Sequence, residues 1–172
     1  AISTNDNTLA NRVRMYANHG RSTKYEHEFE GINSRLDSLQ AAILSVKLNY
    51  LSKWNNRRRK AANYYNDLIS ELGLQIPITN DQKRHTYHLY VTQIRNRDKV
   101  VYEMKTHGIG VAVHYPIAIP FLGAYKNLGY HPKDFPVTFK QMHRLVSLPL
   151  YPEITTRQII YTVDCLKASL GG

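Results

Sequence analysis

Apolar residues recur at helical spacing in the first part of the chain. Leu9, Val13 and Tyr16 step by four and three residues, which is the spacing of one helix face. Asn5 and Asp6 before them are potential N-caps, and Gly20 after them interrupts the pattern. A short helix is therefore predicted before Gly20.

A second helical pattern is much longer. Its apolar positions are Leu36, Leu39, Ile43, Val46, Tyr50, Ala61, Tyr65, Leu68 and Leu72. A helix unbroken over residues 35–72 would be about 55 Å long. Such a helix either connects two bodies or bends near residues 54–56. Gly73 is a suitable C-cap, and Pro77 begins a loop.

The spacing of apolar residues changes from residue 85 onward. Residues 85–94 are rich in Tyr, Thr and Val, which predicts a strand. A helix is expected from Arg97 to Gly108. Residues 111–115 predict a second strand, which Pro116 ends.

Two further helices are expected in the last third of the chain. One follows Pro136, which suits a first helical turn, and carries Phe139, Met142 and Val146. The other begins with the capping-box pattern of residues 155–158 and runs through the last apolar positions. Strand, helix and strand followed by further helices indicate an α/β fold.

The composition is that of an ordinary globular protein. Of its 172 residues, 42% are apolar and 21% are charged, which argues against disorder, collagen and a disulfide scaffold. No apolar run approaches the roughly 20 residues that cross a bilayer, and no signal peptide is recognisable. Because Cys165 is the only cysteine, no internal disulfide can form, and the expected location is a reducing cytoplasm.

The net charge of +10 suggests an anionic partner, such as a nucleic acid, a phosphorylated metabolite or an acidic membrane. Residues 57–60, Arg-Arg-Arg-Lys, form the strongest basic cluster and could grip the phosphates of a nucleic acid. However, four consecutive residues spread over about 400° of a helix, and no aromatic residues are interleaved with them. A solvated helix surface is the favoured interpretation, which argues against nucleic acid as the partner.

Eight histidines invite a metal site, but their spacing argues against one. His85 and His88 are three residues apart on a predicted strand, so their side chains would point to opposite faces. With one cysteine and no His-Glu-x-x-His motif, no metal site is predicted.

Two segments have the residue types of a binding site. In residues 31–37 a flexible glycine precedes Asn33, Ser34 and Arg35 at the start of the long helix. The Asn33 amide and the helix N-terminus could converge on a phosphate there, although simple N-capping by Asn33 or Ser34 explains the spacing equally well. In residues 114–116 a strand ends in an imidazole and a phenol, a common position for functional groups, although a locally satisfied pair is the more frequent case.

Together these segments resemble the DegT/DnrJ/EryC1/StrS family of sugar aminotransferases. The most specific match is residues 31–44, Gly-Ile-Asn-Ser-Arg-Leu-Asp-Ser-Leu-Gln-Ala-Ala-Ile-Leu. The other matches occur in family order at residues 14–20, 87–91, 108–116, 134–136 and 147–152. They cover nearly all of the chain.

The resemblance implies a pyridoxal-phosphate (PLP) enzyme of the fold-type I, aspartate-aminotransferase-like α/β class. The family transfers an amino group, usually from glutamate, to nucleotide-linked keto-sugars, for example in polysaccharide biosynthesis. Its active sites lie between the two subunits of a homodimer. Asn33 would reach the PLP phosphate of the other subunit, with Arg35 nearby. His114 and Tyr115 would border the sugar-nucleotide pocket, and His88 is a weaker candidate for the same pocket.

The family's Schiff-base lysine lies upstream of the segment that corresponds to residues 1–6. No catalytic residue is therefore assigned in this chain, which is expected to be inactive alone. Residues 1–75 would be the tail of the large PLP-binding domain with the connecting helix, and residues 76–172 the small C-terminal α/β domain. The first residues also read like the end of a strand, although a trimmed tag or a processed N-terminus is an alternative.

Two other functions remain open from the sequence. The first is a basic nucleic-acid-binding or regulatory module that uses residues 57–60. The second is a non-catalytic half-length paralogue that only dimerises or scaffolds.

Overall fold

The computed structural model describes residues 2–80 and 83–171 of the chain. Their contacts divide the chain into two compact units, of which the first ends at Tyr50 and the second begins at Leu51. The domain boundary expected near residue 75 stays a prediction.

The first unit contains the predicted N-terminal helix, α1 (Asn7–Tyr16). The Asp6 carboxylate accepts hydrogen bonds from the backbone N–H groups of Thr8 (2.8 Å) and Leu9 (3.0 Å), which confirms it as the N-cap. After α1 the chain forms a loop and returns, so that residues 32–34 pair with residues 16–19 by backbone hydrogen bonds.

Two glycines make this return possible. Gly20 has a φ of +72°, and a Cβ atom there would lie 1.7 Å from the Phe29 carbonyl oxygen. A Cβ atom on Gly31 would lie 2.3 Å from the Gly20 nitrogen and 2.6 Å from the Tyr16 carbonyl oxygen. Since these contacts are with backbone atoms, only glycine fits at either position. We call this close approach the Gly20–Gly31 crossing.

Helix α2 (Ser38–Ser70) is continuous over 33 residues, about 50 Å, with no interruption near residues 54–56. The boundary between the two units falls within it, so it is the connecting helix that the pattern allowed. Its later residues enter the core of the second unit, whereas its earlier apolar residues are exposed. Leu39, for example, is 74% exposed.

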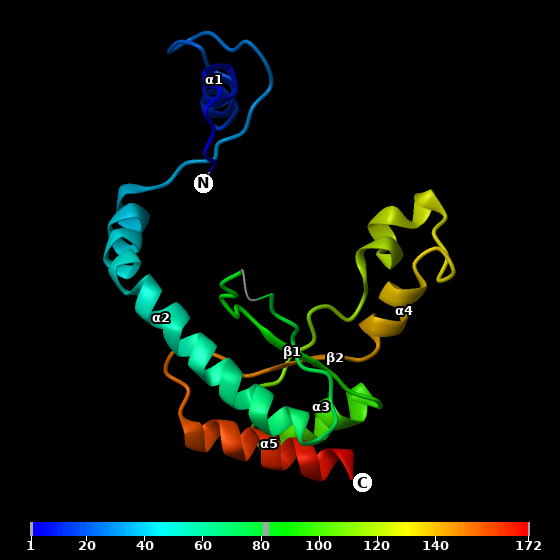
Figure 1. Cartoon of the computed structure of the whole chain (residues 1–172). Helices are drawn as coiled ribbons and strands as arrows, with labels where there is room; N and C mark the ends of the chain where they lie inside the picture. Colours follow the sequence, from blue (N-terminus) through cyan, green and yellow to red (C-terminus); the bar gives the residue numbers. More distant parts are fainter. Residues whose placement is uncertain (1, 81–82, 172) are drawn as a thin grey trace. The chain divides into compact units, whose positions relative to one another are not determined.

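The second unit is built around an antiparallel pair of strands, β1 (Tyr90–Gln93) and β2 (Leu145–Leu148) (Figure 1). Tyr90 lies opposite Leu148, and Gln93 lies opposite Leu145. The predicted strand over 85–94 is therefore present but shorter than expected.

The prediction of a second strand over residues 111–115 is wrong. Only Ala112 pairs, in an isolated bridge with Ser147 on the edge of β2 away from β1. Continuing this pairing would place Gly110 opposite Pro149, which has no N–H to donate. At the other end the chain bends at His114, before Pro116.

The remaining helices are α3 (Arg97–Thr106), α4 (Pro136–Met142) and α5 (Thr156–Leu170), with short 3-10 helices η1 (Ile119–Phe121) and η2 (Gly123–Leu128) before α4. The predicted capping box of α5 is confirmed between Thr155 and Gln158. Val146, expected in the helix that follows Pro136, is instead buried in β2 opposite Thr92. Its β-branched side chain suits a strand, and α4 has already ended at Met142.

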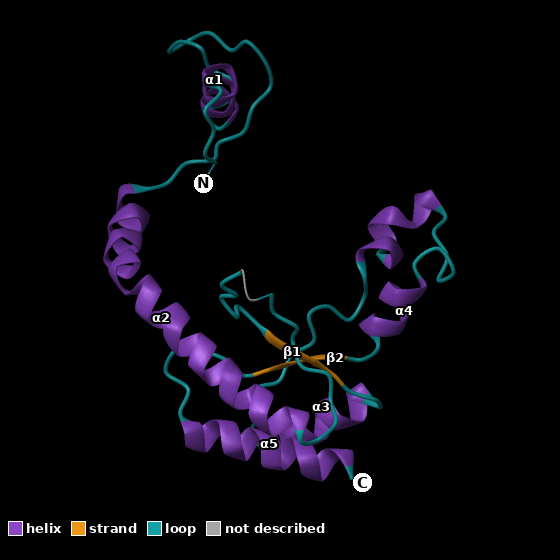
Figure 2. Ribbon diagram, viewed as in Figure 1, coloured by secondary structure: helices purple, strands orange, loops and turns teal. Residues whose placement is uncertain are grey.

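The core of the second unit lies between the strands and the helices α2, α3 and α5 (Figure 2). Its fully buried large side chains include Tyr65 and Ile69 from α2, Tyr90 from β1, Met104 from α3 and Leu166 from α5. Within residues 2–80 and 83–171, no helix is long and apolar enough to span a membrane.

Candidate functional site

Asn33 and Arg35 lie on the returning segment of the first unit. Asn33 forms an antiparallel bridge with Asn18, and the neighbouring Ser34 N–H donates to the Ala17 carbonyl oxygen at 2.9 Å. The side chains of Asn33 and Arg35 are exposed, and neither has a hydrogen-bond partner among the residues that the structure describes. The backbone is thus held in place while two donor side chains stay available.

The alternative that Asn33 or Ser34 simply caps the long helix is wrong. Helix α2 begins at Ser38. The first carbonyl oxygen that accepts a hydrogen bond from the helix is that of Asp37, and its donor is the Ala41 N–H at 2.8 Å. Asn33 is therefore five residues before the helix and is positioned by the end of α1 instead.

His114 and Tyr115 follow the single bridge that joins residue 112 to β2. The half-buried His114 ring lies with its Nδ1 atom 2.8 Å from the Ser147 hydroxyl. Tyr115 is 72% exposed, and its ring meets the His114 ring edge-on with the centroids 5.5 Å apart. The two predicted residues are thus brought together, one anchored to β2 and the other open to solvent.

His88 lies in the segment that leads into β1, which pairs with the edge of β2 opposite to the edge that residue 112 contacts. Its exposed side chain lines a cavity of about 420 Å³ together with Trp54 and Arg58 of α2. The Arg58 guanidinium donates to the Leu150 carbonyl oxygen at 3.0 Å and, more weakly, to that of Tyr87 at 3.5 Å. Arg58 therefore ties α2 to the segment before β1 and to the segment after β2.

Two buried tyrosines support the strands. The Tyr65 hydroxyl donates to the Pro149 carbonyl oxygen at 3.0 Å, and its ring packs against Tyr90 with the centroids 4.9 Å apart. The Tyr90 hydroxyl donates to the Asn66 side chain at 2.8 Å. Burial raises the pKa of Tyr65 to about 12 and also raises the pKa of Tyr90, so both phenols stay neutral hydrogen-bond donors at physiological pH.

The basic cluster of residues 57–60 does not form one surface. Arg58 is half-buried and donates to backbone carbonyl oxygens, and Arg59 donates to the Asn56 side chain within the same helix. Only Arg57 and Lys60 are exposed. The structure therefore favours the structural interpretation of this cluster over a nucleic-acid site.

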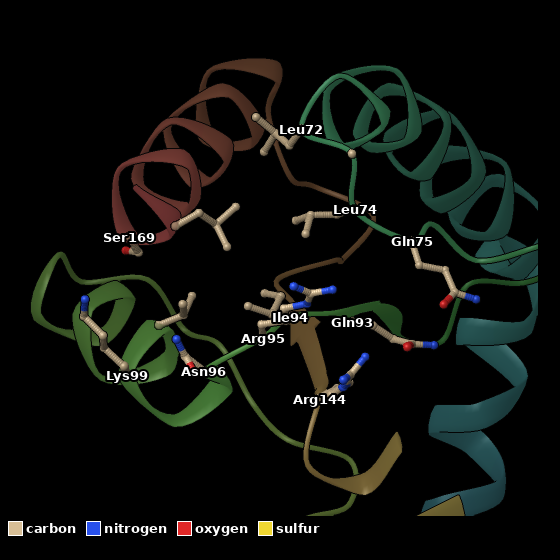
Figure 3. A pocket seen from close by; sticks show the side chains of 13 residues that line it. Leu72, Leu74, Gln75, Gln93, Ile94, Arg95, Asn96, Lys99, Arg144 and Ser169 are labelled. Atoms are coloured by element: carbon tan, nitrogen blue, oxygen red, sulfur yellow. The ribbon is translucent and has the colours of Figure 1, made fainter. Parts of the chain in front are cut away.

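A cavity of about 580 Å³ opens where α2 and α5 end and α3 begins (Figure 3). The cationic side chains of Arg95, Lys99 and Arg144 line it. Carbonyl groups at the C-terminal ends of α2 and α5 offset part of this positive charge. None of the five predicted site residues lines this cavity. Among the described residues, no three His, Cys, Asp or Glu side chains are placed to hold a metal ion.

Residues 1–167 match the sequence profile of the DegT/DnrJ/EryC1/StrS aminotransferase family. The chain belongs to this family. The resemblance inferred from residues 31–44 and the ordered shorter matches is thereby confirmed.

Individual relatives are nucleotide-sugar aminotransferases by name. The dTDP-3-amino-3,6-dideoxy-alpha-D-galactopyranose transaminase of Aneurinibacillus thermoaerophilus is 38% identical, with 97% of this chain and 46% of that protein covered. A UDP-N-acetyl-3-dehydro-alpha-D-glucosamine 3-aminotransferase of Acidithiobacillus ferrooxidans is 32% identical, with 99% of this chain and 46% of that protein covered. The chain spans about half the length of the curated relatives it matches.

The crystal structure of S. venezuelae DesV in complex with a ketimine intermediate superposes with a TM-score of 0.88 at 32% identity. The match covers 96% of this chain and 45% of DesV. The expected fold class, part of a fold-type I aminotransferase, is confirmed by this superposition.

Three residues of this chain have structural roles that the sequence does not indicate. Ser147 lies in a matching motif, but nothing in the sequence points to its partner His114. Arg58 lies among other basic residues, but it is four residues before Ala62 and therefore on the buried face of α2. Gly20 ends a helical pattern and a matching motif, but its close approach to Gly31 has no signal in local spacing.

Proposed function

We propose that the chain is the C-terminal part of a PLP-dependent aminotransferase that transfers an amino group from glutamate to a nucleotide-linked keto-sugar. The observation that carries this proposal is the family match over residues 1–167, supported by the superposition on DesV. No lysine of this chain matches the family's Schiff-base position, so the chain alone is expected to be inactive. A cytoplasmic enzyme is consistent with a single, unpaired cysteine.

The residues of the returning segment fit the phosphate end of PLP. The Asn33 amide and the Arg35 guanidinium are exposed donors without partners among the described residues, and phosphate oxygens are acceptors that such donors bind well. We assign Asn33 to the phosphate directly and Arg35 to the same region. When bound, PLP supplies the electron sink for amino transfer, whereas the residues of this segment bind and orient it.

The His114–Tyr115 pair is proposed to border the sugar-nucleotide pocket. Its imidazole offers a hydrogen-bonding nitrogen, and the exposed phenol of Tyr115 offers a ring face and a hydroxyl. His88 is a further candidate, because it lines a cavity with Trp54, whose indole could pack against an apolar ring. The diphosphate of such a substrate and the PLP phosphate would both suit a chain with a net charge of +10.

The enzyme is proposed to be a homodimer with its active site between the subunits, so that Asn33 reaches the PLP of the other subunit. Supporting this, the first half of α2 exposes several large apolar side chains, a pattern typical of surfaces that contact other protein. These residues are Leu39, Ile43, Leu44, Val46, Leu48 and Tyr50.

The first test is the intact mass of the protein from its native source after borohydride reduction. We expect a chain roughly twice as long as this one with one pyridoxyl group attached. That protein should convert glutamate and a dTDP- or UDP-linked keto-sugar into 2-oxoglutarate and the amino-sugar, detected by mass spectrometry. A native chain of 19.9 kDa without an attached group would refute the catalytic proposal and favour a role in assembly.

The role of Asn33 is tested separately in the full-length protein. Asn33→Ala removes one donor to the PLP phosphate, so the dissociation constant for PLP should rise about tenfold. Asn127→Ala, at an exposed asparagine in η2, is the matched control. Equal PLP retention after dialysis of the two variants would refute the assignment of Asn33.

A further inference from the structure

Ser147 holds both the backbone and the ring that form the His114 site. Its N–H donates to the Ala112 carbonyl oxygen at 2.8 Å, and its carbonyl oxygen accepts from the Ala112 N–H at 3.1 Å. The Ser147 hydroxyl oxygen also lies 2.8 Å from Nδ1 of His114, which is two residues after Ala112. Ser147 is 3% exposed, so water does not compete for these groups.

The buried hydroxyl restricts the proton positions of the neutral imidazole. Within the described part of the chain, the Ser147 Oγ atom has no other hydrogen-bond partner than His114 Nδ1. If Nδ1 carried the ring proton, it would donate to Oγ, and the hydroxyl proton would be left buried without an acceptor. If Nδ1 is bare, the hydroxyl donates to it and both groups are satisfied.

We propose that Ser147 is a positioning residue that keeps neutral His114 in the tautomer with the proton on Nε2. Nε2, the ring nitrogen that does not contact Ser147, is then a hydrogen-bond donor and not an acceptor. This inference rests on the proposed function for its ligand, which is an acceptor oxygen of the nucleotide-linked sugar, such as a diphosphate oxygen. The Nε2–H group of His114 therefore favours ligand groups that accept a hydrogen bond. A ligand group that can only donate would place two donors against each other and would bind more weakly.

Ser147 reaches this position because side chains alternate along β2. Val146 and Leu148 point into the core, whereas Ser147 points to the opposite face of the strand. Residue 112 pairs with Ser147 along the edge of β2, which brings residue 114 close to the Ser147 side chain. A small hydroxyl-bearing side chain at this register reaches the ring of residue 114. An alanine would keep the strand but lose the partner of Nδ1.

The first experiment locates the protons directly. Neutron diffraction from crystals of the full-length holoenzyme at a pH where His114 is neutral should show deuterium on Nε2 of His114 and on Oγ of Ser147. A deuterium on Nδ1 instead would overturn the proposal. This measurement needs no sugar substrate, so its result does not depend on the proposed place of His114 in the sugar pocket.

The second experiment measures kinetics of the full-length enzyme with a nucleotide-linked keto-sugar. Ser147→Ala should raise KM for the sugar about threefold to tenfold with little change in kcat, because one oriented hydrogen bond to bound substrate is weakened. Ser147→Thr keeps the hydroxyl and should restore the wild-type KM. Ser169→Ala is the control, because Ser169 is also buried but its hydroxyl donates to the Cys165 carbonyl oxygen within α5.

The outcomes separate the two proposals. An unchanged KM in Ser147→Ala, together with a raised KM in His114→Ala, would overturn the role of Ser147 alone. An unchanged KM in both variants would overturn the proposed place of His114 in the sugar pocket. If Ser147→Ala does not fold, the neutron result still decides the tautomer.

Discussion

Replacing Gly31 with alanine tests whether the Gly20–Gly31 crossing positions Asn33. The added Cβ atom would lie 2.3 Å from the Gly20 nitrogen, whereas ordinary contacts begin at 3.4 Å. The two chain segments at the crossing must therefore separate by about 1.1 Å (3.4 − 2.3). The bonds nearest to the crossing join the Ile32 N–H to the Tyr16 carbonyl oxygen (2.8 Å) and the Ser34 N–H to that of Ala17 (2.9 Å). A separation of this size breaks hydrogen bonds of such lengths.

The energetic effect follows from these contacts. Overpacking costs about 1–3 kcal/mol, and each of the two lost hydrogen bonds adds about 0.5–1.5 kcal/mol, so local unfolding of residues 17–34 should become easier by about 2–6 kcal/mol. Asn33 would then no longer be held, and PLP should leave the full-length protein faster. The assay is PLP absorbance after gel filtration, combined with proteolysis of residues 17–34.

Gly123→Ala is the matched control, because a Cβ atom there meets nothing within 4 Å and the glycine has no positive φ. The control should retain PLP and resist proteolysis like the wild type. If Gly31→Ala behaves in the same way, the crossing does not position Asn33, and the reasoning from backbone contact is refuted.

Two further predictions concern stability. Arg58→Ala should lower the free energy of unfolding by about 1–3 kcal/mol, because the Leu150 and Tyr87 carbonyl oxygens lose a charged donor, whereas Arg57→Ala at an exposed position should change it by less than about 0.5 kcal/mol. Urea unfolding of the full-length protein compares the two variants, and equal midpoints would contradict the role of Arg58. Burial raises the pKa of Tyr65 from 10.0 to about 12, so its contribution to stability is complete below about pH 10 and is lost as the pH rises through about 12, by at most about 2–3 kcal/mol. Unfolding measured from pH 9 to 12 should show a shallower loss in Tyr65→Phe; identical slopes would contradict this origin of the pH dependence.

The sequence alone determined helices α1, α2 and α5 and the family. Helical periodicity, the Asp6 cap and the capping box at Thr155 are local signals, and the structure places helices α1, α2 and α5 where these signals predict them. The residues proposed to bind PLP and sugar were also available from motifs, because those motifs combine unusual residue types in a fixed order.

Only the tertiary structure decided how far each strand extends and what holds the site residues. Residues 111–115 have the composition of a strand, but their pairing depends on a distant neighbour, and Pro149 limits it to Ala112. Likewise, Ser147 and His114 are 33 residues apart, and their contact depends on the register of two pairings with β2. Such contacts depend on which segments meet in space, and neither propensity nor spacing along the chain encodes that directly.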